Sequence, residues 1–349
     1  MTLAINAQGL VKQFIENYCI WRDNNDFYHK QTFPVLVNYT NGINCFHYTD
    51  INNINLCEDN LIAIDCLTEG IHSRNYFNSY NTNKHYIIFS NGWWDIEHAG
   101  IDQKYSLVNH LFFLFEMSDT YLSPNRFCFY LDKEYKFDYP KKHIFASLIG
   151  NVRSERTYLV DKLVNTINYK NFILRYSGEN FGCNVDELDV IQFTKGNFDP
   201  YINILEKYYH NVSQSLPIKI YNQSYFNLVV ETDINYDHSF FLTEKTIKSL
   251  IMGMPFVIVS TPKFLEHLKA LGFCTYGELW NEDYDQEIDY KTRIDKIIDL
   301  VVQLHNFDWV SNKSKLAEIG RQNQLNFLNL NRRCNLEFKN LEDCIKKLI

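Results

Sequence analysis

The sequence lacks the features of a secreted or membrane-spanning protein. Among its 349 residues there is no run of about 18 apolar residues, the length that a membrane-spanning helix requires. The first residues, MTLAINAQGL, have no charged start followed by an apolar core, so they do not predict a signal peptide. We therefore expect a cytoplasmic protein without a transmembrane segment.

Paired cysteines and an excess of positive charge are also missing. The nine cysteines are scattered without a Cys-x-x-Cys pair, and they are most simply reduced cysteines of the core. The formal net charge is −8, whereas proteins that coat nucleic acid carry a basic excess. We expect neither a disulfide scaffold nor a nucleic-acid partner.

The length and the composition are those of an ordinary globular protein. Hydrophobic residues make up 46% of the chain, charged residues 22% and aromatic residues 16%. A chain of 349 residues is longer than one typical core requires, so it predicts two domains of similar size. A shift to Lys, Asp, Tyr and Pro over residues 132–142 suggests the linker between them.

The most informative stretch covers residues 225–260. It predicts a strand at 226–230, a polar loop, a helix that begins after Thr243, and a buried strand at 256–260. Thr243 is a favourable N-cap, while Gly253 followed by Pro255 supplies the stop. The stretch is therefore expected to form a βαβ unit.

Two charged residues occupy the first turn of this helix. A helix that follows a strand of a parallel sheet begins at the edge where ligands bind, and its free N–H groups attract phosphate. Lys245 would add a full positive charge there, and Glu244 could accept the hydroxyl groups of a ribose. The simpler alternative is that Glu244 complements the helix dipole and Lys245 is a solvated surface residue.

A second unit of this kind is predicted earlier in the chain. Residues 144–149 form an apolar run that predicts a buried strand, and a glycine turn and an amphipathic helix follow. Arg153 and Arg156 lie at the start of that helix, where guanidinium groups suit phosphate oxygens. Alternatively, both are surface arginines that pair with Glu155 and Asp161.

The remaining pattern is weaker but predicts a parallel sheet in the first half as well. An amphipathic helix is expected at residues 3–18, and the segment 177–182 is expected to be a polar glycine loop. Helices are expected to begin after Pro262 and to cover 290–305 and 313–348. The strands expected in the first half are 33–37, 43–47, 61–66, 86–90 and 126–131.

Four short motifs carry a family resemblance by their order and spacing. They are Asn151-Val152-Arg153-Ser154-Glu155-Arg156 after a strand, Phe226-Asn227-Leu228 to Glu231, Phe241-Leu242-Thr243-Glu244-Lys245, and Gly253-Met254-Pro255. Over roughly residues 144–285 the chain resembles the donor-binding half of α1,3-fucosyltransferase-like glycosyltransferases. It departs from the family in having Thr232 after the strand glutamate, where Asn is usual, and Phe241 where the family has Tyr.

The resemblance implies an α/β protein of the GT-B fold, with two Rossmann-type domains, a cleft between them and C-terminal helices that cross back. We expect an N-terminal acceptor-side domain at 1–138, a nucleotide-sugar-binding domain at 139–325 and a C-terminal helix at 326–349. The donor is expected to be a GDP- or UDP-sugar, with no cofactor required. The residues expected to bind it are Asn151, Arg153, Arg156, Glu231, Thr243, Glu244 and Lys245.

The implied reaction is an inverting, metal-independent transfer of a sugar to a glycan or another hydroxyl acceptor. Basic side chains and helix N-termini would neutralise the charge that develops on the leaving nucleoside diphosphate. Such a transfer also needs a base for the acceptor hydroxyl. The loop after the strand expected at 86–90 offers Asp95, Glu97 and His98 beside Trp93 and Trp94, and we favour Glu97 for its longer reach.

Several alternatives stay open at this point. The base could instead lie in the segment with Asp65, Glu69 and His72, and the two tryptophans could be core aromatics. The protein could be a catalytically inactive nucleotide-sugar or glycan-binding module of the same fold, because a fold does not fix a function. It could also be a glycosyltransferase acting on nucleic-acid bases, which the net charge disfavours.

Overall fold

The structure, a computed structural model, divides into two compact units that are described separately. Unit 1 comprises Met1–Phe112, His238–Phe241 and Leu330–Ile349, and unit 2 comprises Phe113–Asp237 and Leu242–Asn329. The domain boundaries expected at 138/139 and 325/326 stay predictions. The structure describes residues 5–6, 43–47, 61–66, 85–94, 105–110, 134–167, 171–176, 179–182, 217–235 and 239–328.

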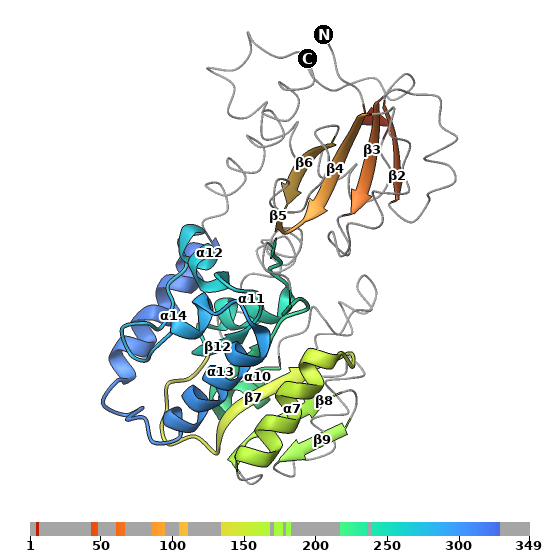
Figure 1. The fold of residues 1–349 in the computed structure, drawn as a ribbon. Coiled ribbons are helices and arrows are strands. Elements are labelled where there is room, and N and C mark those ends of the chain that lie inside the picture. Colours follow the sequence, from red (N-terminus) through yellow and green to blue (C-terminus); the bar gives the residue numbers. More distant parts are fainter. Residues whose placement is uncertain are drawn as a thin grey trace. The chain divides into compact units, whose positions relative to one another are not determined.

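Unit 1 contains a sheet of five parallel strands in the order β1-β2-β3-β4-β6 (Figure 1). The described side chains at its centre, such as Ile64 and Phe89, are fully buried. A separate two-stranded ladder pairs β5 with β11 in antiparallel fashion. The strands are β1 (Ile5–Asn6), β2 (Ile43–His47), β3 (Leu61–Cys66), β4 (His85–Asn91), β5 (Trp93–Trp94), β6 (Tyr105–His110) and β11 (Ser239–Phe240).

Three of the strands predicted in the first half are confirmed, whereas those predicted at 33–37 and 126–131 lie outside the described residues. The helix predicted at 3–18 is wrong over Ile5–Asn6, the part of it that is described. Residues 43–47, 61–66 and 86–90 are strands as expected. Ile5–Asn6, expected to lie in a helix, instead pairs in parallel with Ile43 and Asn44 at the sheet edge. A long-range backbone pairing here overrides a local helical pattern, which is only a weak prior.

Unit 2 contains a second sheet, in the order β12-β10-β7-β8-β9. Its first four strands run parallel, and β9 closes the edge by antiparallel pairing with β8. The segment predicted as a polar loop at 177–182 therefore contains an edge strand. The strands are β7 (His143–Ile149), β8 (Ile173–Tyr176), β9 (Glu179–Gly182), β10 (Ser224–Val230) and β12 (Phe256–Val259).

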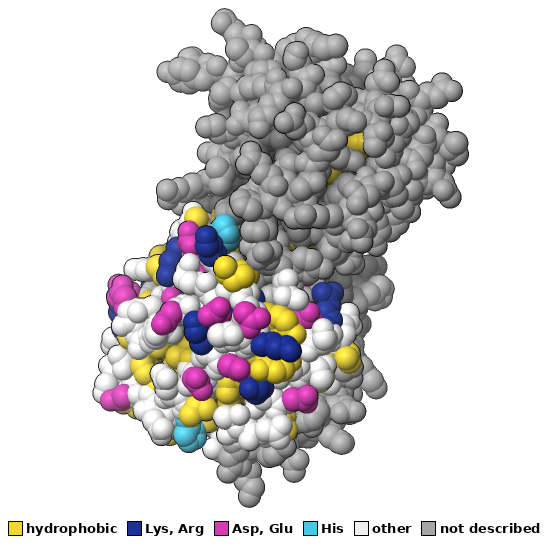
Figure 2. Space-filling view, viewed as in Figure 1, with side chains coloured by type: hydrophobic (Ala, Val, Ile, Leu, Met, Phe, Trp, Pro, Cys, Tyr) yellow, Lys and Arg dark blue, Asp and Glu magenta, His cyan; other side chains and the backbone are white. Residues whose placement is uncertain are grey.

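Helices cover this sheet. Helix α7 packs against α13, and α11 packs against α14. The face of unit 2 seen in Figure 2 mixes acidic and basic side chains. Ion pairs of unit 2 include Lys162–Asp295 and Lys296–Glu287. Among the described residues, no helix combines the length and the apolar character needed to cross a membrane. The helices are α7 (Ser154–Thr166), α10 (Ile218–Asn222), α11 (Glu244–Met252), α12 (Phe264–Ala270), η4 (Asp283–Gln286), α13 (Tyr290–Leu304) and α14 (Lys313–Leu328).

The predicted βαβ unit is confirmed as β10-α11-β12. The hydroxyl of Thr243 caps α11 by accepting the N–H of Lys245, and Gly253 ends the helix with a left-handed conformation at φ 66°. All four residues of β12 are buried, as expected for a strand covered on both faces. The coarse prediction of an α/β protein with parallel sheets is therefore correct.

The segment expected to be a linker packs within unit 2 over its described part, 134–142. The backbone N–H of Tyr135 donates to Met252 O at 2.9 Å, and its hydroxyl donates to Ser224 O at 2.8 Å. Lys141 Nζ donates to Asn222 O at 2.9 Å. These bonds fasten the segment to the end of α11, the start of β10 and the end of α10.

The contact between α11 and α14 depends on two glycines. A Cβ added to Gly320 would come closer to the carbonyl oxygen of Gly253 than real Cβ contacts allow. Gln324 Nε2 also donates to Ile251 O at 3.0 Å, across the same contact. The two helices therefore meet backbone to backbone, which only glycine permits.

We expect Gly320→Ala to lower the free energy of unfolding by about 1–3 kcal/mol, because the new methyl group overpacks a rigid backbone contact. The gain in helix propensity, at most about 1 kcal/mol, opposes this only in part. Gly150→Ala is the matched control, since a Cβ there meets nothing within 4 Å. Urea unfolding of both variants measures the difference, and equal stability would show that α11 and α14 do not touch at Gly320.

Candidate functional site at a strand-order reversal

The candidate site lies where the order of strands in unit 2 reverses. β7 and β10 are neighbours, but the chain leaves β7 through α7 toward β8 on one side and leaves β10 through α11 toward β12 on the other. The carboxyl ends of such a diverging pair form a crevice in open α/β sheets. A cavity of about 340 Å³ lies there, lined by residues 153–156 and 232–235. Its size falls in the range of small-molecule sites.

The two arginines expected at this site differ in exposure and in how many of their donors are already used. Arg156 is 3% exposed and donates to Asn151 O and Glu231 O, both at 3.0 Å. The Arg153 side chain is 40% exposed, donates to Thr232 O at 3.0 Å and lies 3.6 Å from the carboxylate of Asp233. Arg156 therefore fastens one loop to the other, whereas Arg153 has donors left for a ligand.

The start of α7 supplies further donors to the cavity. Arg153 occupies the N-cap position, and its side chain makes no capping hydrogen bond. The first intrahelical amide bond is donated by Thr157, so the amides of Ser154, Glu155 and Arg156 precede the helical ladder. An anion in the cavity would meet these N–H groups and the positive end of the helix dipole.

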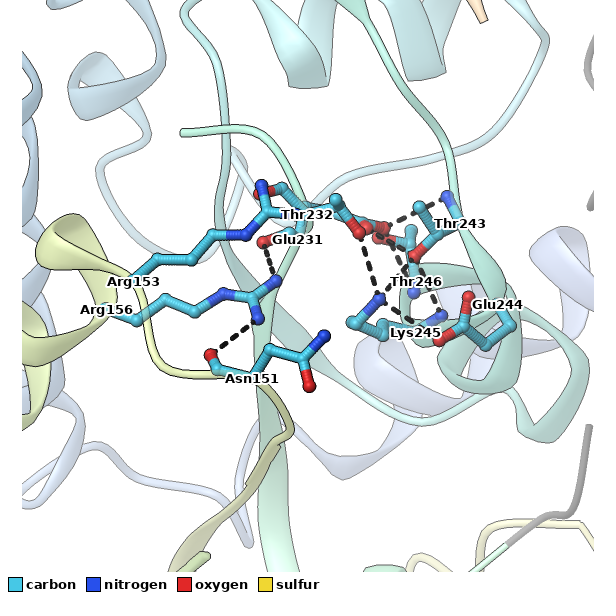
Figure 3. A network of polar contacts seen from close by, with 9 residues as sticks. All are labelled: Asn151, Arg153, Arg156, Glu231, Thr232, Thr243, Glu244, Lys245 and Thr246. Atoms are coloured by element: carbon cyan, nitrogen blue, oxygen red, sulfur yellow. Dashed lines mark hydrogen bonds and ion pairs between the residues drawn. The ribbon is translucent and has the colours of Figure 1, made fainter. Parts of the chain in front are cut away.

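Glu231 was expected to bind the ligand, but its carboxylate is buried and bonded to α11. Its side chain is fully buried and is directed toward α11 rather than toward the cavity lining (Figure 3). The carboxylate accepts the hydroxyls of Thr243 and Thr246, the latter at 2.6 Å, and their backbone N–H groups at 3.3 and 3.4 Å. Burial raises the pKa of Glu231, while Lys245 and the two hydroxyls oppose the rise. Glu231 thus anchors the first turn of α11.

This anchoring changes what α11 can offer. The N–H of Lys245 is bonded to Thr243 Oγ1, and the N–H of Thr246 is bonded to Glu231. Most of the amides that a helix N-terminus presents to an anion are therefore occupied, unlike those of α7. What α11 adds to the site is the side-chain charge of Lys245.

Lys245 and Arg153 approach each other through Thr232. Lys245 Nζ lies 3.2 Å from Thr232 Oγ1 and 3.0 Å from Glu244 Oε1, and its side chain is 22% exposed. Arg153 bonds the carbonyl of the same threonine, which lines the cavity. The position where the resembled family has Asn is therefore the meeting point of the two accessible cations (Figure 3).

Glu244 stays ionised despite its burial. Burial alone would raise its pKa, but Lys245 and Lys248 outweigh this and hold the pKa of Glu244 below the usual range. Burial lowers the pKa of Lys248, one turn further along α11, to about 8. The carboxylate is thus available as an acceptor for ligand hydroxyls at neutral pH.

The seven residues expected to bind the donor belong to one network of polar contacts (Figure 3), but only Arg153 and Arg156 among them line the cavity. The expected base lies outside the described residues. Asp95, Glu97 and His98, and the competing Glu69 and His72, belong to segments that the structure does not describe. Trp93–Trp94 form β5, whose backbone pairs with β11. The assignment of the base stays a prediction.

Two residues that shape this site, Thr232 and Thr246, were not predicted from the sequence to do so. Thr232 and Thr246 were not singled out as partners of Lys245 and Glu231, although a Thr-x-x-Thr spacing over the first helical turn could have suggested the second. An Asp-x-Asp triplet outside the cavity lining, Asp283-Tyr284-Asp285, was also not recognised from the sequence. Asp285 in this triplet accepts the N–H groups of Leu265 and Glu266 at the start of α12.

We expect Glu231→Gln to lower the free energy of unfolding by about 1–3 kcal/mol, because an amide cannot accept both hydroxyls and both N–H groups at once. Thr246→Val removes one of these donors, so the double variant should lose less than the sum of the two single losses. Guanidinium unfolding of the four proteins gives the coupling energy. A stability loss that is fully additive would mean that Glu231 does not hold α11.

Comparison with known proteins gives one distant structural neighbour to report. No protein-family model and no curated protein matches the sequence. In the comparison of structures, the chain is similar to a crystal structure of an α1,3-fucosyltransferase, with 14% sequence identity, 97% of this chain and 89% of that chain covered, and a TM-score of 0.38.

Proposed function

We propose that this protein is a glycosyltransferase of the GT-B type that transfers a sugar from a nucleotide-diphosphate donor to a hydroxyl acceptor. The observation that carries the proposal is the cavity at the strand-order reversal of unit 2. There the uncapped start of α7 faces the loop with Thr232, and this threonine bonds the side chains of both Arg153 and Lys245. Backbone amides and fixed cations around one concave site are the chemistry that binds phosphate.

The local charge balance supports a site for a bound diphosphate rather than a surface that attracts any anion. Arg153 is offset by Asp233, and Lys245 is offset by Glu244, so each cation has an acidic partner. An entering diphosphate would take over part of these interactions and add the free amides of α7. Glu244 would then be released from Lys245 to accept the ribose hydroxyls.

The same groups would assist the departure of the nucleoside diphosphate. As the bond between the sugar and the diphosphate breaks, negative charge grows on the leaving phosphate, and Lys245 and Arg153 would stabilise it. This proposal needs no metal ion for charge neutralisation. An inverting transfer would also require a base for the acceptor hydroxyl, proposed to be Glu97, with Asp95 and His98 beside it.

A thermal-shift screen against GDP-, UDP-, CMP- and dTDP-sugars tests the binding part of the proposal. A ligand that binds only the folded protein raises its melting temperature. We expect a nucleoside diphosphate carrier, GDP or UDP, to give the largest rise. A rise with no sugar transfer to any acceptor would favour the inactive binding module, and no rise with any donor would contradict the proposal.

Lys245→Ala and Arg153→Ala should each weaken binding of the nucleoside diphosphate by about 10- to 150-fold, because each removes a charge-assisted contact of about 1.5–3 kcal/mol. Isothermal titration calorimetry measures the change. Arg156→Ala is less suitable, since it leaves two carbonyls of the loops without their donor.

The controls for these two variants remove similar charges far from the cavity. Lys315→Ala breaks a surface ion pair with Glu278, and Arg321 is an exposed residue of α14. Lys315→Ala and Arg321→Ala should bind the nucleotide as the natural protein does. Wild-type affinity in Lys245→Ala or Arg153→Ala would remove that residue from the phosphate site.

Glu97→Gln should reduce turnover by about 10² or more while changing donor affinity little, the pattern expected when a general base is lost. Asp95→Asn serves as the comparison within the same segment. If both variants keep near-normal turnover, the proposed base is wrong, and variants of Asp65, Glu69 and His72 follow.

A further inference from the structure

Arg293 is a fully buried cation whose partners are main-chain carbonyls. It lies on α13, is 1% exposed, and donates from Nε to Ser260 O at 2.9 Å and from Nη1 to Ile288 O at 3.1 Å. Nη1 also donates to Glu287 O, and Nη2 donates to Ile234 O. One guanidinium thus joins four carbonyls from three separate parts of unit 2.

One of these carbonyls belongs to the wall of the candidate site. Ile234 lies in the segment 232–235 that lines the cavity, opposite the start of α7. The near end of the same loop is fixed by Glu231, whose carbonyl accepts from Arg156 and whose carboxylate anchors α11. Arg293 fixes the far end, so the loop is held at both ends by buried charged groups.

The other three carbonyls bonded by Arg293 belong to the segments to which the loop 232–235 is fastened. Ser260 directly follows β12, and Glu287 and Ile288 lie in the short connection between η4 and the N-cap of α13. A buried guanidinium is unfavourable unless its donors are satisfied, and its planar fork suits several fixed acceptors at once. Burial lowers the pKa of Arg293 to about 10, so the side chain remains charged at neutral pH.

We propose that Arg293 is a positioning residue of the ligand site, which holds the cavity wall 232–235 against β12 and α13 in the shape that receives the ligand. Arg293 does not line the cavity itself, so it acts through Ile234. The consequence for binding rests on the proposed function, whereas the hold on the loop does not.

Amide hydrogen exchange of the full chain tests the hold on the loop. In Arg293→Lys, the amides of residues 232–235 should exchange about tenfold faster than in the natural protein, while those of β7 and α7 stay unchanged. In Arg293→Met the acceleration should be larger, because no donor remains. If lysine keeps part of the protection of these amides and methionine does not, Arg293 acts through hydrogen bonds and not through packing alone. Unchanged exchange at 232–235 in Arg293→Lys would overturn the proposal.

Glu282→Gln is the matched control, because Glu282 is another nearly buried charged residue that fastens a turn of unit 2. It accepts the N–H of Tyr276 at 2.8 Å and the hydroxyl of Thr275 at 2.6 Å, and it does not line the cavity. This variant should lose stability and exchange faster at 275–276, but not at 232–235. If Glu282→Gln also speeds exchange at 232–235, the faster exchange in the Arg293 variants reflects a general loss of stability, and the proposal is overturned.

Titration with GDP and with UDP tests the consequence for the site. Arg293→Lys should bind the nucleotide that the natural protein prefers about tenfold more weakly, whereas Glu282→Gln should bind it within twofold. Equal affinity in Arg293→Lys would refute the positioning role. If the natural protein binds neither nucleotide, the proposed function fails, and hydrogen exchange alone decides whether Arg293 holds the loop.

Discussion

The site depends on the parallel pairing of β7 with β10. Because the chain leaves these neighbouring strands in opposite directions, the loops after them come together without any helix between them. The first loop leads into the uncapped start of α7, and the second carries Glu231 and Thr232. The contacts of Arg153, Arg156, Glu231 and Lys245 join these two loops or the helices that follow them.

Buried charges then keep the second loop in place. Glu231 is bound to the first turn of α11, Arg156 ties the carbonyl of Glu231 to the first loop, and Arg293 ties Ile234 to the end of β12 and the start of α13. Each of these groups is buried, so removing its partner leaves an unsatisfied charge or dipole. Arg153 and Lys245 remain partly exposed on this fixed frame, as suits residues that contact a ligand.

Local patterns in the sequence predicted much of this arrangement. The N-cap Thr243, the C-terminal Gly253 and the apolar run at 256–259 are signals read within a few residues, and all three were correct. Arg293 and Gly320 could not be recognised in the same way, because their partners lie 59 and 67 positions away, at Ile234 and Gly253. Ile5–Asn6 shows the same limit, since a distant strand decides its conformation.

A crystal structure of the protein with GDP or UDP would show whether the cavity at the strand-order reversal binds the nucleotide. We expect the phosphates to lie in the cavity beside Thr232, within hydrogen-bonding distance of the α7 amides at Ser154–Arg156 and of the side chains of Arg153 or Lys245. Glu244 should face the ribose. A nucleotide bound elsewhere, or phosphates directed away from Thr232, would contradict this expectation.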